Sequence, residues 1–396
     1  MLAAVIATAL APAALAPLQI KGRSFVDPTG KPVLLRGVNL GGWLVEEIWM
    51  TPWAEDRPAD VPTDWPEKVG DHKSLWTVVE KRLGKEAMLR VRKAWRDHWI
   101  TENDFARIKK AGFNHVRVPF LYHLIDEPNG MDWLHKAVAW AKKNDLYVVL
   151  DLHGTPGGQS GEHHTGERDR NRLWFDVENI ARFEQVWTRV GKEFADEPAV
   201  AVYDLMNEPM GAPNPAMLHL VYDRVVRAVR KVAPKKPILI DDGYKGFETT
   251  PHPNVPGWEQ VAFSLHFYQF ESKRPQDHVA SLKERMGRIK ELQGYRDAPL
   301  YIGEFNLEPH GNSDNMREFT GLMSEQGWSW ALWTYKAIAK SGPMGQWGFY
   351  RKAGPADVLD PYRDSEETLI RKMRQVLTEN LENPPGLNPF PGLAPK

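Results

Sequence analysis

The chain has 396 residues, of which 42% are hydrophobic, so it is long enough for one large domain with a sizeable core. Its 51 basic and 52 acidic residues give a formal net charge of −1, which provides no electrostatic basis for binding nucleic acid or an anionic membrane. The absence of cysteine excludes disulfides and thiol catalysis.

The first segment, residues 1–16, is an apolar run rich in alanine and leucine that ends in Ala14-Leu15-Ala16. This ending is typical of a signal-peptide cleavage site, although the run has no basic residue at its start. It is too short to span a bilayer comfortably. We expect a secreted or periplasmic protein with a single domain over residues 17–396.

A hairpin is predicted next, with Phe25-Val26 and residues 32–35 on either side of a Pro- and Gly-containing turn at residues 27–30. Eight short apolar segments follow at intervals, as expected for strands that are buried on both faces. These predicted strands are residues 34–38, 115–118, 147–150, 200–205, 238–240, 262–265, 300–302 and 328–332.

Helical periodicity occupies the intervals between the strands. Apolar residues keep a spacing of three and four between residues 134 and 141, and again between residues 218 and 229. Strand and helix alternating eight times favours an α/β fold of the closed (β/α)8 or TIM-barrel type over a doubly wound sheet.

The main irregularity is a long insertion, residues 44–99, between the first and second strands. It is rich in proline and tryptophan at its start and helical from about residue 75. Its position places it over the C-terminal mouth of the barrel, where loops of this length are usually functional. Seven of the chain's 16 tryptophans lie within the first 99 residues, and they either stack on sugar rings or fill the core. The Pro- and Gly-rich tail from Asn383 is compatible with an ordered wrap or a loose end.

Two glutamates directly follow predicted strands, in Asn207-Glu208-Pro209 and in Gly303-Glu304. The C-terminal ends of barrel strands converge on one mouth, so these carboxylates can meet there. Two facing carboxylates are what glycoside hydrolysis requires, one as acid and the other as nucleophile or base. Taken singly, Glu208 is also explained as an acid at a helix start, and Glu304 as a solvated loop carboxylate.

Polar and aromatic companions make this pair more specific. Arg117 lies inside an apolar strand, and a buried cation needs a partner, which we expect to be a carboxylate at the barrel mouth. Beside Glu304, it would keep that group ionised as a nucleophile. Other strands end in His153, His266, Tyr268 and Trp333, and these ends share one rim. Each residue alone more often has a structural role.

A metal site is a further use for the histidines. Neither a His-x-His on the first strand nor an HExxH motif is present, so we predict no metal and no cofactor. His163 and His164 lie in a Gly- and Arg-rich loop and are expected to be solvated or to face substrate. The residues that supply candidate zinc ligands are His153, His163, His164, His266, Asp241 and Asp242.

Several motifs recur in the order in which glycoside hydrolase family 5, the cellulase-like family, carries them. The resemblance covers about residues 34–350. The matching motifs are Arg36-Gly37-Val38-Asn39-Leu40-Gly41-Gly42-Trp43, Arg117, Asp151-Leu152-His153-Gly154, Asn207-Glu208-Pro209, His266-Phe267-Tyr268, Gly303-Glu304 and Trp333.

The resemblance implies a (β/α)8 barrel and a retaining mechanism in which Glu208 is the acid/base and Glu304 the nucleophile. Tyr268 would hydrogen-bond the nucleophile, and Trp333 would form the floor under the sugar that is attacked. The residues that would line this subsite are Arg117, His153, Asn207, His266, Tyr268 and Trp333.

Residues 37–47 and 151–161 most resemble the exo-β-1,3-glucanases and relatives that act on β-glucosides, which implies that Glu47 contacts the terminal glucose. Ile48 stands where that branch usually has proline, and residues 333–336 differ from its usual segment. We therefore expect a retaining β-glycosidase whose partner is an oligosaccharide, polysaccharide or β-glucoside of β-linked glucose. Mannan, xylan or the head group of a glycolipid are alternative substrates, and a catalytically silent carbohydrate-binding barrel is an alternative function.

Overall fold

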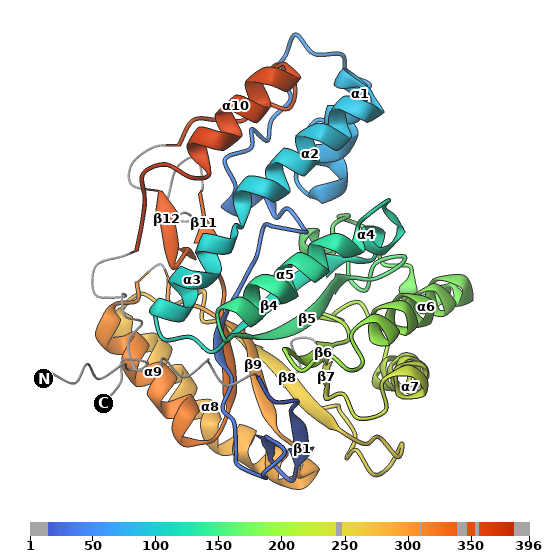
Figure 1. Ribbon diagram of the computed structural model, residues 1–396, viewed down its shortest axis with the longest axis vertical. Helices are drawn as coiled ribbons and strands as arrows, with labels where there is room; N and C mark the ends of the chain where they lie inside the picture. Colours follow the sequence, from blue (N-terminus) through green and yellow to red (C-terminus); the bar gives the residue numbers. More distant parts are fainter. Residues whose placement is uncertain (1–14, 243–247, 309, 339–346, 353–355, 384–396) are drawn as a thin grey trace, which may run out of the picture.

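The computed structural model describes residues 15–242, 248–308, 310–338, 347–352 and 356–383. Most of the predicted signal segment (residues 1–14) and nearly all of the predicted tail (residues 384–396) lie outside the described residues. Figure 1 shows a strand barrel surrounded by helices, with a further group of helices at one end.

Eight parallel strands form a closed barrel in the order β10-β3-β4-β5-β6-β7-β8-β9, which confirms the predicted fold. Each predicted strand coincides with an observed one, although β4, β5, β8 and β9 run further towards the mouth than predicted. The strands are β3 Arg36–Asn39, β4 His115–Leu121, β5 Tyr147–Gly154, β6 Val200–Asp204, β7 Ile238–Asp241, β8 Val261–Phe267, β9 Leu300–Phe305 and β10 Ser329–Leu332.

Helices cover the outside of the barrel, and α5 and α7 confirm the two predicted periodicities. The predicted alternation is broken once, because the described residues between β7 and β8 form turns and no helix. The helices are α3 Glu102–Lys110, α4 Tyr122–Asp126, α5 Met131–Lys143, η2 His163–Thr165, η3 Leu173–Phe175, α6 Val177–Glu193, α7 Pro215–Val232, α8 Pro275–Arg296 and α9 Ser313–Glu325.

A hairpin closes the N-terminal end of the barrel, but its partner strand differs from the predicted one. Strand β2 (Ser24–Val26) pairs antiparallel with the preceding β1 (Gln19–Lys21). The turn at residues 27–30 forms as expected, yet Pro32 makes only an isolated bridge to Val26. Proline has no N–H to extend a ladder, and the chain must then leave to enter the barrel as β3.

This hairpin packs into the barrel interior. Leu18 and Phe25 are buried in a cluster with inward-facing strand residues, among them Tyr147 and Tyr301. The larger part of the core lies between the strands and the surrounding helices. The barrel is therefore filled at its N-terminal end and open for a site at the other.

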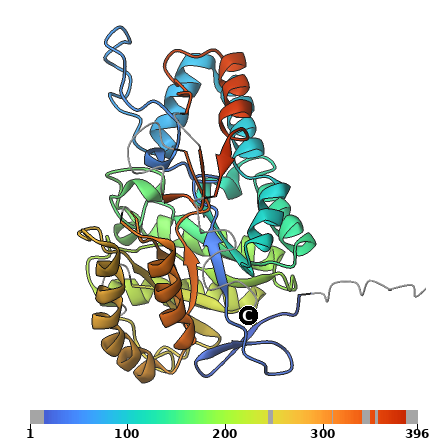
Figure 2. The same cartoon turned by 90° about the vertical axis from the view of Figure 1, so that its left-hand side faces the viewer.

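The insertion forms a separate layer at the mouth. It contains η1 Ile48–Met50, α1 His72–Leu83 and α2 Lys85–Trp99, and α2 packs against α10 Glu366–Val376 (Figures 1 and 2). A small sheet of β11 Lys336–Ala337, β12 Tyr350–Lys352 and β13 Leu381–Glu382 completes the described chain. Among the helices of the described residues, none has the length and apolar character needed to cross a membrane.

The tryptophans of this region are mostly core residues. Trp43, Trp53, Trp95 and Trp99 are fully buried, and the last two stack with their ring centroids 4.6 Å apart. Of the seven tryptophans in the first 99 residues, Trp49 lines the cavity at the mouth. The composition of the insertion thus reflects packing more than sugar binding.

Candidate active site

A cavity of about 390 Å³ opens at the C-terminal ends of the barrel strands. Arg117 and His266 do not line it directly, but they contact carboxylates that do. The other predicted site residues all contribute to its wall. They are Glu47, His153, Asn207, Glu208, Tyr268, Glu304 and Trp333.

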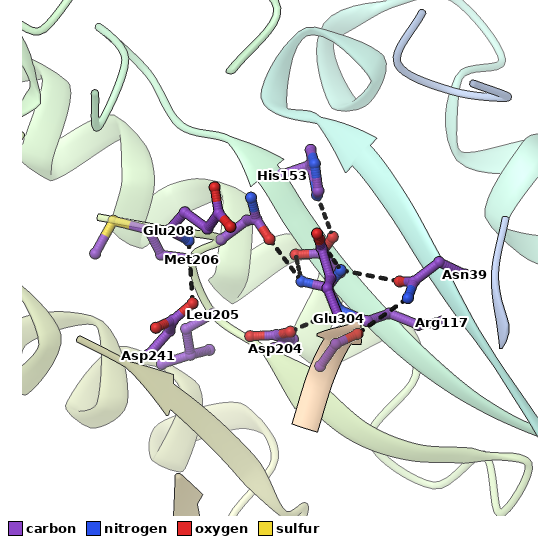
Figure 3. A network of polar contacts seen from close by, with 12 residues as sticks. Asn39, Arg117, His153, Asp204, Leu205, Met206, Glu208, Asp241 and Glu304 are labelled. Atoms are coloured by element: carbon purple, nitrogen blue, oxygen red, sulfur yellow. Dashed lines mark hydrogen bonds and ion pairs between the residues drawn. The ribbon is translucent and has the colours of Figure 1, made fainter. Parts of the chain in front are cut away.

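Arg117 lies at the centre of a fully buried polar network (Figure 3). Its Nη1 donates to Glu304 Oε1 at 2.9 Å, and its Nε donates to Asp204 Oδ2 at 2.9 Å. Its Nη2 donates to Asn207 Oδ1 at 2.8 Å and lies 3.1 Å from Asp151 Oδ1. The expected carboxylate partner is therefore present, together with two carboxylates that the sequence argument did not foresee.

Strand register and hydrogen bonds together position the Arg117 side chain. Asn39 on β3 is the direct neighbour of Arg117 on β4, and its side-chain oxygen accepts from Nη1 at 3.0 Å. The side-chain nitrogen of Asn39 donates to the carbonyl of Gly303 at 3.0 Å. One guanidinium thus joins β3, β4, β5, β6 and β9 at the base of the cavity.

Glu304, at the end of β9, receives a hydrogen bond on each oxygen. Arg117 donates to Oε1, and the Tyr268 hydroxyl donates to Oε2 at 2.9 Å. Burial raises the pKa of Glu304, and His266 and Arg117 oppose that rise. The sequence argument considered the cation but not the burial. Because arginine can only donate, the contact with Arg117 nevertheless favours the ionised carboxylate.

Gly303 makes room for this arrangement. A β-carbon at this position would lie 2.9 Å from His266 Nε2 and 2.8 Å from Ser264 Oγ. The barrel register sets His266 directly beside Glu304. A side chain at position 303 would therefore displace His266 from the site.

Glu208 follows β6 in a strained backbone conformation, with φ of 40°. A non-glycine residue in this left-handed region is uncommon, and such strain concentrates at functional sites. Its N–H donates to Asp241 Oδ2 at 3.2 Å (Figure 3). Its Oε1 lies 2.6 Å from Nδ1 of His266, whose pKa is lowered by burial to about 4. Glu208 therefore faces a neutral imidazole.

One side of the cavity is bounded by charged groups centred on Glu47. Burial raises the pKa of Glu47, but hydrogen bonds with His153 and His163 outweigh it and hold the pKa well below its ordinary value. Burial lowers the pKa of His153, but Asp151, at 2.6 Å from its Nδ1, outweighs it and raises the pKa to about 10. Glu47 is thus an ionised acceptor beside a cationic histidine.

The histidine loop is more buried than the sequence suggested. His163 Nε2 lies 3.2 Å from Glu47 Oε2, and His164 Nε2 lies 3.2 Å from Glu208 Oε2. The His164 side chain is only 9% exposed, so the expectation of a solvated residue is wrong for it. Both histidines line the cavity, as a substrate-facing position requires.

Aromatic rings form another part of the cavity wall. Trp333 stacks on His153 with centroids 5.4 Å apart. Trp49 meets Trp347 edge to face at 5.6 Å, and Tyr268 stacks on Phe270 at 5.2 Å. Phe270 is 67% exposed and lines the cavity. Flat apolar faces next to charged acceptors suit a ring that carries hydroxyl groups.

Sequence reasoning gave no role to Asn39, Asp204 or Asp151, although Asn39 and Asp151 stand within motifs that it quoted. A signal was available for Asp151, because residues two apart on a strand share one face and Asp151 precedes His153 by two. For Asp204 the only cue was an acid in an apolar strand, which does not identify its partner.

Among the described residues, Glu208, His266 and Glu304 offer ligand atoms within 4.8 Å of one another and could hold a metal ion. Glu208 is in contact with His266, and Glu304 accepts from Arg117 and Tyr268, an arrangement that suits proton transfer. Two carboxyl groups, one beside a cation and a phenol and the other between neutral imidazoles, can act as nucleophile and acid/base on a glycoside.

The family model described as cellulase (glycosyl hydrolase family 5) matches residues 80–338. The probable glucan 1,3-beta-glucosidase A of Emericella nidulans is 32% identical over 308 residues, covering 74% of this chain and 68% of the relative. That of Neosartorya fischeri is 30% identical over 293 residues, covering 69% of this chain. The match spans 65% of that relative, slightly less than two thirds of its length. The crystal structure of rutinosidase from Aspergillus niger shares the fold, with a TM-score of 0.59, 19% identity and coverage of 78% of this chain and 91% of that one.

Proposed function

The chain belongs to glycosyl hydrolase family 5, and we propose that it hydrolyses β-glucosidic linkages by a retaining, double-displacement mechanism. The observation that carries this proposal is the pair of carboxylates at the barrel mouth. Glu208 and Glu304 each present an oxygen within 4.8 Å of the other's. Retaining enzymes hold their two carboxyl groups about 5–5.5 Å apart, whereas inverting enzymes need about 6.5–9.5 Å to admit a water.

In the first step Glu304 attacks the anomeric carbon while Glu208 gives its proton to the leaving oxygen. Arg117 and Tyr268 hold the two oxygens of Glu304 and so orient it for attack. The pKa of Tyr268 is raised well above its ordinary value by burial, so its phenol keeps the proton that it donates. The first step leaves the sugar bonded to Glu304. In the second step Glu208 takes a proton from a water whose oxygen attacks the anomeric carbon, so the bond to Glu304 breaks and the sugar leaves with its configuration retained.

The proposed substrate carries a terminal β-linked glucose. An ionised Glu47 accepts hydrogen bonds from neighbouring hydroxyls, and Trp333 supports the ring as a floor. Trp49 donates to Glu47 Oε2 at 2.9 Å and fixes that carboxylate at the wall. These groups in the cavity wall favour attack at the end of a glucan chain or on a small β-glucoside. The relatives named as glucan 1,3-beta-glucosidases support the glucan assignment.

Nucleophile and acid/base are distinguished by azide rescue of two variants. Glu304→Ala abolishes hydrolysis of an aryl β-glucoside. Azide then attacks the anomeric carbon from the side that the Glu304 carboxylate occupied and gives the α-glucosyl azide. Glu208→Ala lowers kcat/KM by about 10²–10⁴-fold for a poor leaving group, and azide gives the β-glucosyl azide. Glu308→Ala, a nearby glutamate outside the cavity wall, serves as the control with unchanged activity. Wild-type activity in Glu304→Ala would refute the mechanism.

A panel of laminarin-, cellulose-, mannan- and xylan-type oligosaccharides, with a glucosyl lipid, tests the sugar. The proposal predicts glucose as the first product, released from glucosyl substrates. Preferential release of mannose or xylose would show that the substrate is a mannan or a xylan and not a glucan. No activity on any glycoside would favour a carbohydrate-binding barrel.

We also propose that the protein is exported, on the apolar composition of residues 1–16 alone. Mass spectrometry of the N-terminus after expression in a secreting host tests this. A mature chain that begins near Pro17 in the extracellular or periplasmic fraction would support it, and an intact chain retained inside the cell would contradict it.

A further inference from the structure

His164 occupies a position that no part of the proposed mechanism uses. It lies in η2, lines the cavity, and its side chain is 9% exposed. Its Nε2 is 3.2 Å from Glu208 Oε2, and its Nδ1 is 3.4 Å from the side-chain nitrogen of Asn207. The ring thus lies between the amide of Asn207 and the carboxyl group of Glu208.

The network fixes which nitrogen of His164 carries the proton. Arg117 Nη2 contacts Asn207 Oδ1 at 2.8 Å, and because arginine can only donate, the amide oxygen must face Arg117. The amide nitrogen therefore faces His164 and donates to Nδ1. Burial lowers the pKa of His164 to about 4, so the ring is neutral and has a single proton. That proton is on Nε2, which faces Glu208 Oε2.

A series of donors consequently leads from Glu304 through Arg117 and Asn207 to His164, which lies beside Glu208. Arg117 donates to Glu304 through Nη1 and to Asn207 through Nη2. Asn207 donates to His164, and Nε2 of His164, a buried atom with no hydrogen-bond partner among the described residues, lies 3.2 Å from Glu208 Oε2. A donor at a carboxylate stabilises the ionised form, which Glu208 must adopt when its proton leaves and keep until it activates water.

We propose that His164 is a positioning residue: its buried Nε2, 3.2 Å from Glu208 Oε2, donates a hydrogen bond to Glu208 once that group is ionised and stabilises it in the form that activates water. The inference rests on the proposed function, because it assigns Glu208 as the acid/base. His266 contacts the other oxygen, Oε1, at 2.6 Å, so the two imidazoles lie beside different oxygens of the carboxyl group.

Other charged and titratable groups surround this contact and remain in place in the variants. Glu208 is faced from β7, β8, β9 and the segment after β8 by Asp241, His266, Glu304 and Tyr268. His164 is faced, besides Glu208, by His153, Glu47 and His163.

The test is the pH profile of kcat/KM on an aryl β-glucoside, measured with the full chain. In His164→Ala the ionised Glu208 loses a donor, so the alkaline limb moves to higher pH by about one unit. His164→Gln keeps an N–H on a side chain of similar length and is expected to restore the limb in part. His163→Ala is the matched control, since its ring contacts Glu47; it raises KM and leaves the limb in place.

Three results would overturn the proposal: an alkaline limb unchanged in His164→Ala, a limb moved to lower pH, or an equal shift in His163→Ala. A wild-type enzyme without glycosidase activity would instead refute the proposed function. Where His164→Ala does not fold, ring ¹⁵N NMR of the wild type decides. A neutral ring protonated on Nε2 above about pH 4 supports the proposal, and protonation on Nδ1 contradicts it.

Discussion

Arg117 is the residue on which the geometry of the candidate site depends. It is fully buried and contacts three carboxylates and two amides from four other strand ends. Burying a cation costs free energy unless each of its donors has a partner. The buried carboxylates around Arg117 likewise need its positive charge. The same guanidinium therefore supports both folding and the orientation of Glu304.

Replacing Arg117 with methionine is expected to reduce the free energy of unfolding by about 3–5 kcal/mol, because three buried carboxylates lose their cation. Burial already raises the pKa of Asp204 to about 7, and without Arg117 it rises further above its unfolded value. The folded state then binds protons more tightly than the unfolded state, so stability increases as pH falls. The deficit relative to wild type should shrink between pH 8 and pH 5.

Urea unfolding at the two pH values measures this, with Arg317→Met as the control. Arg317 pairs with Asp314 on an exposed helix face, where the loss should stay below about 1 kcal/mol. A deficit in Arg117→Met that is equally small, or that does not depend on pH, would contradict the account.

At the scale of elements, the insertion supplies a wall of the cavity, and contacts with its own helix α1 hold that wall in place. Glu46 is fully buried, pairs with His72 at the start of α1, and accepts from Trp76 Nε1 at 3.1 Å. Its neighbour Glu47 points instead into the cavity. One residue thus ties the segment to α1 while the next faces the substrate.

Glu46→Gln should lower the free energy of unfolding by about 1–3 kcal/mol and raise KM more than it lowers kcat. Burial raises the pKa of Glu46, but His72 outweighs it and lowers the pKa, so the carboxylate is the form that binds there. Loss of this pair loosens the segment that positions Glu47. Steady-state kinetics and urea unfolding measure the two effects.

The exposed pair of Arg90 on α2 with Glu366 on α10 gives the control, Glu366→Gln, which should change stability by less than about 1 kcal/mol and leave KM unaltered. An unchanged KM in Glu46→Gln would show that α1 does not position the cavity wall.

At the scale of the whole molecule, the two ends of the barrel have separate roles. The hairpin of β1 and β2 closes the N-terminal end, and the helices of the insertion lie at the opposite end (Figure 1). The cavity opens at that opposite end. This division is typical of barrel enzymes, in which the N-terminal face contributes stability and the C-terminal face chemistry.

Phe25→Ala should therefore cost about 3–5 kcal/mol of folding free energy and leave kcat/KM of the folded enzyme unchanged, because Phe25 is only 2% exposed and lies at the closed end. Urea unfolding and activity at a temperature where the variant is folded test the two halves of this prediction. A large loss of kcat/KM would mean that the two ends of the barrel are coupled.

The sequence by itself predicted the eight strands, two of the helical periodicities and several of the residues that line the cavity, because apolar runs and strand-end motifs are local properties of the chain. Strand ends of a parallel barrel must share one rim, so counting strands was enough to bring Glu208 and Glu304 to the same mouth.

Only the tertiary structure decided which groups meet there. Arg117 pairs with Asp204, 87 residues away, and with Glu304, 187 residues away, and no local pattern encodes such contacts. The same holds for the partner of β2, the burial of most early tryptophans, and the contact of His164 with Glu208. Each depends on register and packing between segments distant in sequence. Burial, which raises the pKa of Glu304 and lowers that of His266, exists only once those segments have come together.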